Sequence, residues 1–103
     1  MVLTLTVERD VIPGSQGPIK ELLRDLRSGA TRQPGFIFGQ TVVDAFSPTI
    51  FMTISRWSSM AVWDRWEKDP ERSAIIERID TLLQRKPKVR MWLDDEDAPA
   101  AGL

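Results

Sequence analysis

The sequence predicts an α+β domain in which strands and helices follow one another in the order βαββαβ. Alternation of apolar and polar residues indicates strands, and apolar residues three and four positions apart indicate helices. Two apolar runs separated by a Ser-Pro turn supply the central strands. The segments with these patterns are residues 2–8, 19–26, 36–44, 50–57, 62–66, 75–83 and 89–93.

The first strand is expected over residues 2–8, where one face carries only Leu and Val. A connection rich in turn residues follows, and Pro18 suits the first turn of a helix. Apolar residues over 19–26 form one helical stripe, and Gly29 is expected to end the helix.

The second and third strands, residues 36–44 and 50–57, carry apolar side chains on both faces. Phe36, Phe38, Gln40 and Val42 are expected on one face of the second strand. A sheet with one face in water would show clean alternation instead. Helices can cover one face only, so we expect a second sheet to cover the other.

The second helix is expected in two pieces. Ser58 or Ser59 can cap a short first piece, and Asp69 followed by Pro70 is a start signal for the second. A Lys-Pro pair then ends the helix before the last strand, residues 89–93. The resulting order is that of a ferredoxin-like fold with an antiparallel four-stranded sheet.

Length and composition limit the functions that are open. With 103 residues we expect one domain over residues 1–93 and an acidic, disordered tail over 94–103. The net charge of -1, from 14 basic and 15 acidic residues, gives no support for nucleic-acid binding. Cys and His are both absent, and no signal peptide or membrane span is evident, so we expect a cytoplasmic protein.

Several short motifs, in this order and spacing, resemble the antibiotic biosynthesis monooxygenase family. They are the Val11-Ile12-Pro13-Gly14 step, Pro34-Gly35-Phe36, Arg56-Trp57-Ser58, the VWDRW run over residues 62–66, and Pro87-Lys88-Val89-Arg90. The resemblance covers residues 2 to about 92. It implies a dimeric α/β barrel, in which the sheets of two protomers pack face to face. Some members of the family are cofactor-free oxygenases of polycyclic phenolic substrates, others degrade haem, and many have no assigned activity.

Haem degradation is disfavoured for this chain. The haem-degrading branch uses an Asn, a Trp and a His, and the resemblance places these at Val7, Trp66 and Ile76. Only the Trp is present, and the chain has neither Asn nor His at any position. Imidazole is a common iron ligand, so the missing His argues against a haem site.

A cofactor-free oxygenase needs a dry pocket, orientation of the substrate and a positive charge near the developing anion. Trp66 is the first candidate, because its indole N–H can orient a substrate oxygen and its ring can stack on a flat substrate. Arg90 is the candidate for stabilising an anion, because Arg keeps its charge when partly buried. Phe38, Gln40 and Trp63 are candidate substrate-binding residues. Each of these residues can also have a purely structural role, in the core, in a dimer interface or at the solvent.

The leading hypothesis is therefore a homodimeric, cofactor-independent monooxygenase that acts on a flat aromatic small molecule, phenolic or anthrone-like. No general base, metal-ligand spacing or nucleotide-binding motif is evident. The alternative is a non-catalytic dimeric module that binds a small molecule. Neither hypothesis involves nucleic acid, a membrane or a cofactor.

Overall fold

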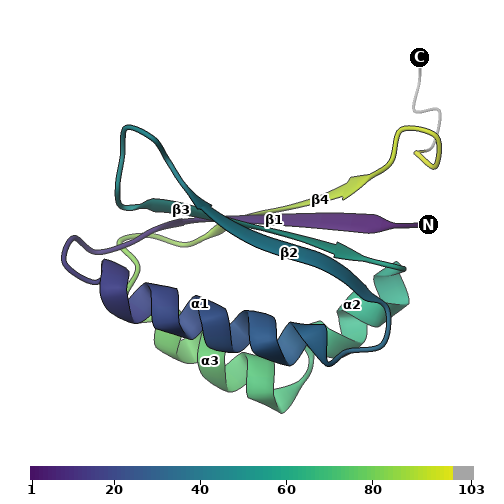
Figure 1. The fold of residues 1–103 in the computed structure, drawn as a ribbon, viewed down its shortest axis with the longest axis horizontal. Helices are drawn as coiled ribbons and strands as arrows, with labels where there is room; N and C mark the ends of the chain where they lie inside the picture. Colours follow the sequence, from purple (N-terminus) through teal and green to yellow (C-terminus); the bar gives the residue numbers. More distant parts are fainter. Residues whose placement is uncertain (99–103) are drawn as a thin grey trace.

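The computed structural model describes residues 1–98, which form a four-stranded antiparallel sheet with three helices on one face (Figure 1). The predicted fold class is confirmed, including the division of the second helix. The elements are β1 (Leu3–Asp10), α1 (Gln16–Thr31), β2 (Phe36–Val43), β3 (Ile50–Trp57), α2 (Met60–Glu67), α3 (Pro70–Asp80) and β4 (Lys88–Leu93).

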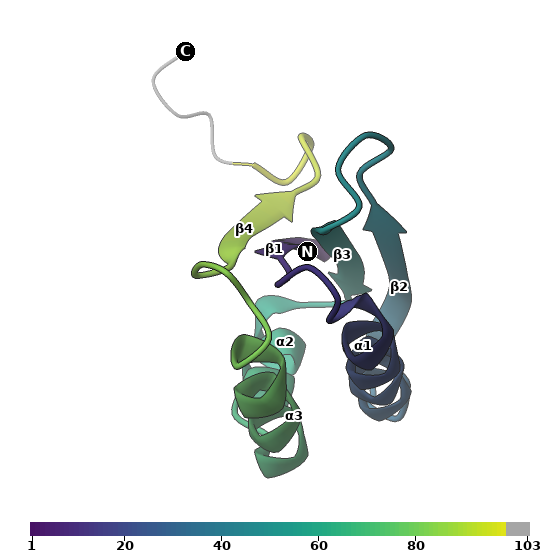
Figure 2. The ribbon, with the colours of Figure 1, turned by 90° about the vertical axis from the view of Figure 1, so that its left-hand side faces the viewer.

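The strands lie in the order β2-β3-β1-β4, so the first strand is central and pairs with β3 and β4. Leu3 pairs with Trp57 on one side and with Leu93 on the other. Alternate residues of β1 are buried, as the period of a strand packed on one face requires. The buried row faces the helices, which Figure 2 shows as two columns beneath the sheet, α1 beside α2 and α3.

One predicted row of β2 is interrupted by a bulge. The register shifts between Phe36 and Phe38, which places these two rings on opposite faces of the sheet. Phe36 packs edge-on against Trp57 on the helix side, with 5.1 Å between ring centroids. The expectation that Phe36 and Phe38 share a face was wrong, because a one-residue irregularity reverses the alternation that follows it.

The prediction that Gly29 ends the first helix was also wrong. Helix α1 starts at Gln16, two residues before Pro18, and continues through Gly29 to Thr31. A Cβ atom at Gly29 would lie 2.5 Å from Cη2 of Trp66. Gly29 is therefore the position at which α1 passes closely over an indole ring. By contrast, Gly35 has a φ of 92° and lies in the predicted turn before β2.

The two start signals of the split helix act as expected. The side chain of Ser59 accepts a hydrogen bond from the backbone N–H of Val62 at 3.2 Å and caps α2. Asp69 accepts one from Glu71 at 2.8 Å and caps α3, with Pro70 in its first turn. These caps satisfy backbone donors that have no partner inside the helices.

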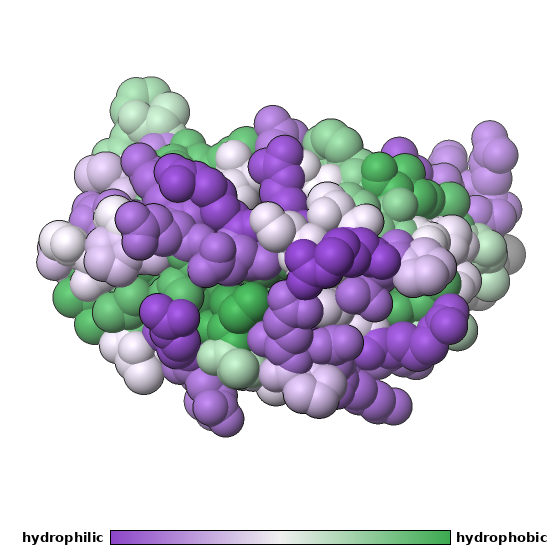
Figure 3. Space-filling model, turned by 60° about the horizontal axis from the view of Figure 1, so that its bottom comes forward, coloured by the Kyte–Doolittle hydropathy of each residue, from purple (hydrophilic) through white to green (hydrophobic). Residues whose placement is uncertain are grey.

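The face of the sheet without helices carries many apolar side chains. Phe38 and Trp92 are 43% and 42% exposed, and every residue of β4 is exposed. The outer surface of the helical layer is instead largely hydrophilic (Figure 3). Within residues 1–98 the helix-free face has no covering layer, and the helix-side row of β4, Val89, Met91 and Leu93, is exposed as well.

The structure describes the first half of the predicted tail, residues 94–98. Residues 94–98 form a turn closed by a 2.9 Å hydrogen bond from the backbone N–H of Asp97 to the carbonyl of Asp94. Residues 99–103 of the predicted tail lie outside the described residues. None of the described helices has the length and apolar character needed to cross a membrane.

Candidate active site

A partly open cavity of about 60 Å³ lies between the helices and the sheet. All three helices and the strands β1, β2 and β3 contribute to its wall. Three tryptophans, three arginines and polar residues from the strands stand out among the lining residues. They are Trp57, Trp63, Trp66, Arg9, Arg27, Arg72, Gln40, Thr41, Thr53 and Ser55.

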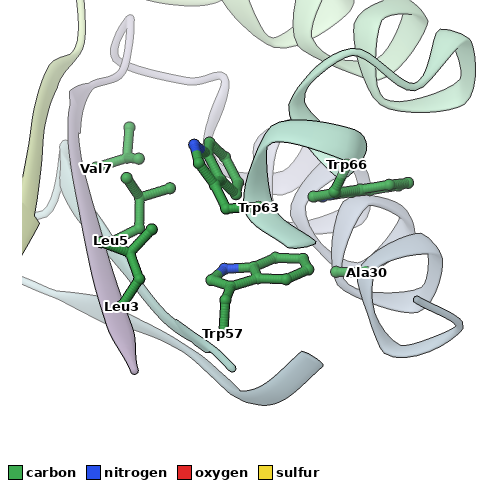
Figure 4. Packing of buried hydrophobic residues seen from close by; sticks show 7 residues of the cluster. All are labelled: Leu3, Leu5, Val7, Ala30, Trp57, Trp63 and Trp66. Atoms are coloured by element: carbon green, nitrogen blue, oxygen red, sulfur yellow. The ribbon is translucent and has the colours of Figure 1, made fainter. Parts of the chain in front are cut away.

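The tryptophans form one aromatic wall of the cavity (Figure 4). Trp57 ends β3 and meets Trp63 of α2 edge-on, with 5.5 Å between ring centroids. The indole N–H of Trp57 donates to Ser55 Oγ at 3.0 Å. The indole nitrogen of Trp63 is buried and has no hydrogen-bond partner within residues 1–98. In Figure 4 this nitrogen lies on the side of the ring that faces β1, level with Val7.

Arg9 is the buried charge of the cavity. It continues the buried row of β1 beyond Val7 and is only 4% exposed. One guanidinium N–H donates to Thr53 Oγ1 at 3.3 Å, while Nε has no partner in the described part of the chain. Burial, and then the positive charge of Arg72, lower the pKa of Arg9 to about 10, against a smaller opposing effect of Asp80. Arg9 is therefore charged at neutral pH and pays a desolvation cost.

Arg72 supplies a second cation from the start of α3. Its guanidinium carbon lies 4.9 Å from the centre of the Trp63 ring, a cation–π contact. Burial lowers its pKa, although Glu67 and Asp80 raise it in part. It also donates a long hydrogen bond, 3.4 Å, to the backbone carbonyl of Glu67.

Among residues 1–98, all charged residues that line the cavity are arginines. No Asp or Glu among the described residues lines it, and neither Arg9 nor Arg72 forms an ion pair with any residue from 1 to 98. Buried charges are normally paired. The cavity therefore presents positive charge and hydrogen-bond donors, which the exposed carboxylates of Asp80 and Glu67 offset only in part from outside its lining.

The structure brings the side chains of two of the five predicted site residues, Trp63 and Trp66, to this cavity. Gln40 is also among the lining residues, but it is exposed and pairs with Ile54, whose row faces the helix-free side. The cavity wall includes consecutive residues of β2 around Gln40, whose side chains alternate between faces, so part of this wall is backbone. Trp66 is 2% exposed and packs closely over Gly29 of α1.

Phe38 and Arg90 are not brought to the cavity. Phe38 pairs with Arg56 of β3, and Arg90 pairs with Thr6 of β1, both on the helix-free face. The Arg90 guanidinium stacks on Trp92 at 4.2 Å from the ring centre. Phe38 and Arg90 therefore lie on the opposite side of the sheet from Trp66.

Sequence reasoning missed Arg9 and Arg72. Arg9 had a signal, because it occupies the position after Val7 in a row that is otherwise Leu and Val. A charge in such a row indicates either a strand end at the solvent or a functional group. Arg72 had no comparable signal, because its approach to Trp63 depends on how α3 turns back beneath the sheet.

Among residues 1–98, no group of three or more His, Cys, Asp or Glu side chains is arranged to hold a metal ion. The chemistry that the described side chains offer is electrostatic. Donors and positive charge can stabilise an anion, and the indole rings can hold a flat ring system.

Comparison with known proteins agrees with this architecture. SnoaB from Streptomyces nogalater, described as a cofactor-independent oxygenase, superposes with a TM-score of 0.84 at 14% identity, covering 95% of this chain and 97% of that one. The protein Rv0793 from Mycobacterium tuberculosis gives 0.86 at 14% identity, covering 96% and 100%. A conserved protein from Methanosarcina mazei Go1 gives 0.86 at 13% identity, covering 89% and 91%.

At these identities the structural matches show a shared fold and no more. No curated protein matches the sequence. Residues 2–78, however, match the sequence model of the family described as antibiotic biosynthesis monooxygenase. This match covers most of the chain, and it confirms the family resemblance that the sequence motifs suggested. The chain belongs to the antibiotic biosynthesis monooxygenase family.

Proposed function

We propose that the protein is a homodimeric, cofactor-independent monooxygenase of the cytoplasm that acts on a flat aromatic small molecule, phenolic or anthrone-like. The observation that carries this proposal is the cavity, in which three indole rings adjoin the buried positive charge of Arg9, which has no ion-pair partner within residues 1–98. SnoaB, a cofactor-independent oxygenase, has the same fold, which adds support by analogy.

The proposed reaction needs little from the protein beyond binding and electrostatics. An anthrone methylene and one O₂ give a carbonyl and one water, so no further reductant is required. The substrate loses a proton, and its anion passes one electron to O₂. The resulting radical and superoxide combine to a peroxide. Breaking of the O–O bond, with loss of the second methylene hydrogen, then yields the carbonyl and water.

The chain's own residues have distinct roles in this scheme. Trp57 and Trp63 hold the aromatic rings, and the inner part of the partly open cavity limits the access of water to the anion. Arg9 and Arg72 stabilise the negative charge that develops when the proton is lost. Trp66 of α2 completes the aromatic wall where α2 packs against Gly29 of α1. Because Arg90 lies on the other face of the sheet, we assign it to the dimer interface.

The homodimer is proposed on the basis of the helix-free face. Phe38, Val42 and Trp92 are exposed there, and Ile54 is half-buried. A second copy of the same sheet covers such a face symmetrically. An obligate interface of this kind buries about 2,000 Å² or more in total. Light scattering after size exclusion should give twice the mass of the chain.

Oxygenation is tested with anthrone and isotopically labelled O₂. We expect protein-dependent oxygen consumption above the spontaneous rate, and one labelled oxygen in the anthraquinone product. Arg72→Gln should lower the rate. Arg78→Gln, which removes an exposed charge from the same helix, serves as the matched control. Ligand binding without any oxygen consumption would refute the enzyme and leave the non-catalytic binding module.

A further inference from the structure

Two buried hydrogen-bond donors of the cavity have no acceptor within residues 1–98. They are Nε of Arg9 and the indole nitrogen of Trp63, and neither has a partner among the described residues. Leaving a buried donor unsatisfied costs about 1–3 kcal/mol, and more when the group is charged. Buried polar groups of native proteins are nearly always satisfied. Two such donors in one cavity indicate that an acceptor from outside the chain completes the site.

The charges around the cavity specify the sign of that acceptor. Arg9, Arg72 and Arg27 line the cavity together. Asp80 acts electrostatically on Arg9 and Arg72, and Glu67 acts on Arg72. Both carboxylates are exposed, and neither lines the cavity. A neutral acceptor would satisfy the donors but leave the charge of Arg9 uncompensated. An anionic acceptor satisfies both.

We propose that Arg9, Arg72 and the indole N–H of Trp63 form an anion site, which takes the negatively charged oxygen of a flat aromatic ligand while the rings of Trp57 and Trp63 contact its ring. The site itself follows from the burial and charge of these residues. Only the identification of the anion as the substrate rests on the function proposed above.

The size of the cavity determines how a ligand lies in it. A cavity of about 150 Å³ holds one benzene molecule, whereas this one measures about 60 Å³. The enclosed part therefore accommodates the charged group and the adjoining ring edge. The rest of the ligand extends through the open side. Gly39 of β2 and the exposed Arg27 of α1 also line the cavity, and a Cβ atom at Gly39 would be 3.8 Å from Cγ of Arg27.

The anion site gives the cavity a chemical role in place of a general base. Two positive charges and a donor stabilise the ionised form of a bound phenol or enol over its neutral form. The pKa of a hydroxyl in the site is thereby lowered, and the proton leaves to water through the open side. The substrate is then already an anion when O₂ arrives, without a carboxylate or imidazole to remove its proton.

The test compares ligands that differ only in charge. 4-Nitrophenol is titrated with the protein beside its methyl ether, 4-nitroanisole, and 4-nitrobenzoate beside 4-nitrobenzamide. We expect each anion to bind at least about tenfold more tightly than its neutral partner. Because only the ionised form of 4-nitrophenol is yellow, its pKa in the complex can be read from absorbance, and it should fall by about one unit or more. A preference for the nitrophenol pair alone identifies a phenolate site, whereas a preference for the benzoate pair alone identifies a carboxylate site and refutes base-free ionisation.

Variants assign the preference to the residues. Arg9→Gln and Arg72→Gln should each reduce the preference for the anion by about tenfold, and Arg9→Lys should retain part of it. Arg78→Gln should leave it unchanged. Thermal unfolding of each variant shows whether it is folded, and Arg72→Gln alone decides the matter if Arg9→Gln does not fold. Equal binding of charged and neutral partners by the unmodified protein would overturn the anion site. Anion preference without oxygen consumption would instead refute only the oxygenase.

Discussion

Replacing Arg9 with Met should make the protein more stable while it weakens anion binding. Met keeps an unbranched side chain in the cavity wall but carries no charge. Burial and the positive charge of Arg72 lower the pKa of Arg9 to about 10. At about 1.4 kcal/mol per pKa unit, this lowering corresponds to about 3 kcal/mol against the charged form in the folded state. The hydrogen bond to Thr53 returns about 1 kcal/mol. The expected net gain is about 2 kcal/mol.

The gain should be complete at neutral pH. The folded protein holds the Arg9 proton less tightly than the unfolded chain does. The cost of the charge is therefore fully present below the folded pKa of about 10, and it disappears only as the pH rises above that value. The difference in stability between the two proteins should thus be constant over about pH 6 to 9.

Urea denaturation provides the measurement, with both proteins at the same protomer concentration because a dimer's stability depends on it. The midpoint should rise with an unchanged slope. Arg9→Lys retains a buried charge and should give no gain. If Arg9→Met is less stable than the unmodified protein, Arg9 is a structural residue whose charge is compensated in the fold. The reasoning behind the anion site would then fail.

Three further predictions concern packing, ligand binding and assembly. Gly29→Ala should destabilise the protein by about 1–3 kcal/mol because its Cβ would meet Trp66. Gly17→Ala, where the Cβ enters open space, should instead stabilise the protein by about 0.4–1 kcal/mol. Equal effects of the two substitutions in thermal unfolding would contradict the close contact between Gly29 and Trp66. Trp63→Phe should weaken anion binding by up to about tenfold, while Trp66→Phe should chiefly lower thermal stability. If ligand titration and thermal unfolding show the larger loss of binding for Trp66→Phe, then Trp66 is the hydrogen-bond donor to the anion. Ile54→Asp should give monomers by light scattering, and an unchanged mass would place the dimer contact elsewhere.

Most of the fold could be predicted because it depends on local patterns. The burial alternation of β1 and the caps at Ser59 and Asp69 are visible in the sequence and appear in the structure. The errors came from contacts between distant segments. Gly29 is of a residue type that often ends a helix, yet it lies inside α1. The contact with Trp66 leaves no room for a Cβ atom at this position. The bulge after Phe36 likewise left no signal in the residue pattern.

The candidate site was predictable in part. Trp66 was predicted because its indole can orient and stack on a flat substrate and because it matches the family's Trp position, and Trp63 lies three residues before it on the same helix. Arg90 was predicted as the cation and Arg9 was missed, although the two lie on neighbouring strands of the same sheet. Their different environments depend on which face of the sheet each side chain takes. Register places Arg9 on the covered face and Arg90, opposite Thr6, on the open one.

The sequence by itself determined the order of the elements, the family and the apolar surplus of the central strands, because each depends on residue types and their spacing. The tertiary structure decided which charges are buried. A guanidinium in a strand is exposed or enclosed according to the helices that pack above it, and for Arg9 the enclosing residues come from β3 and α3, more than forty positions away. Desolvation is a property of that assembled environment, so the cationic character of the cavity became evident only in the folded chain.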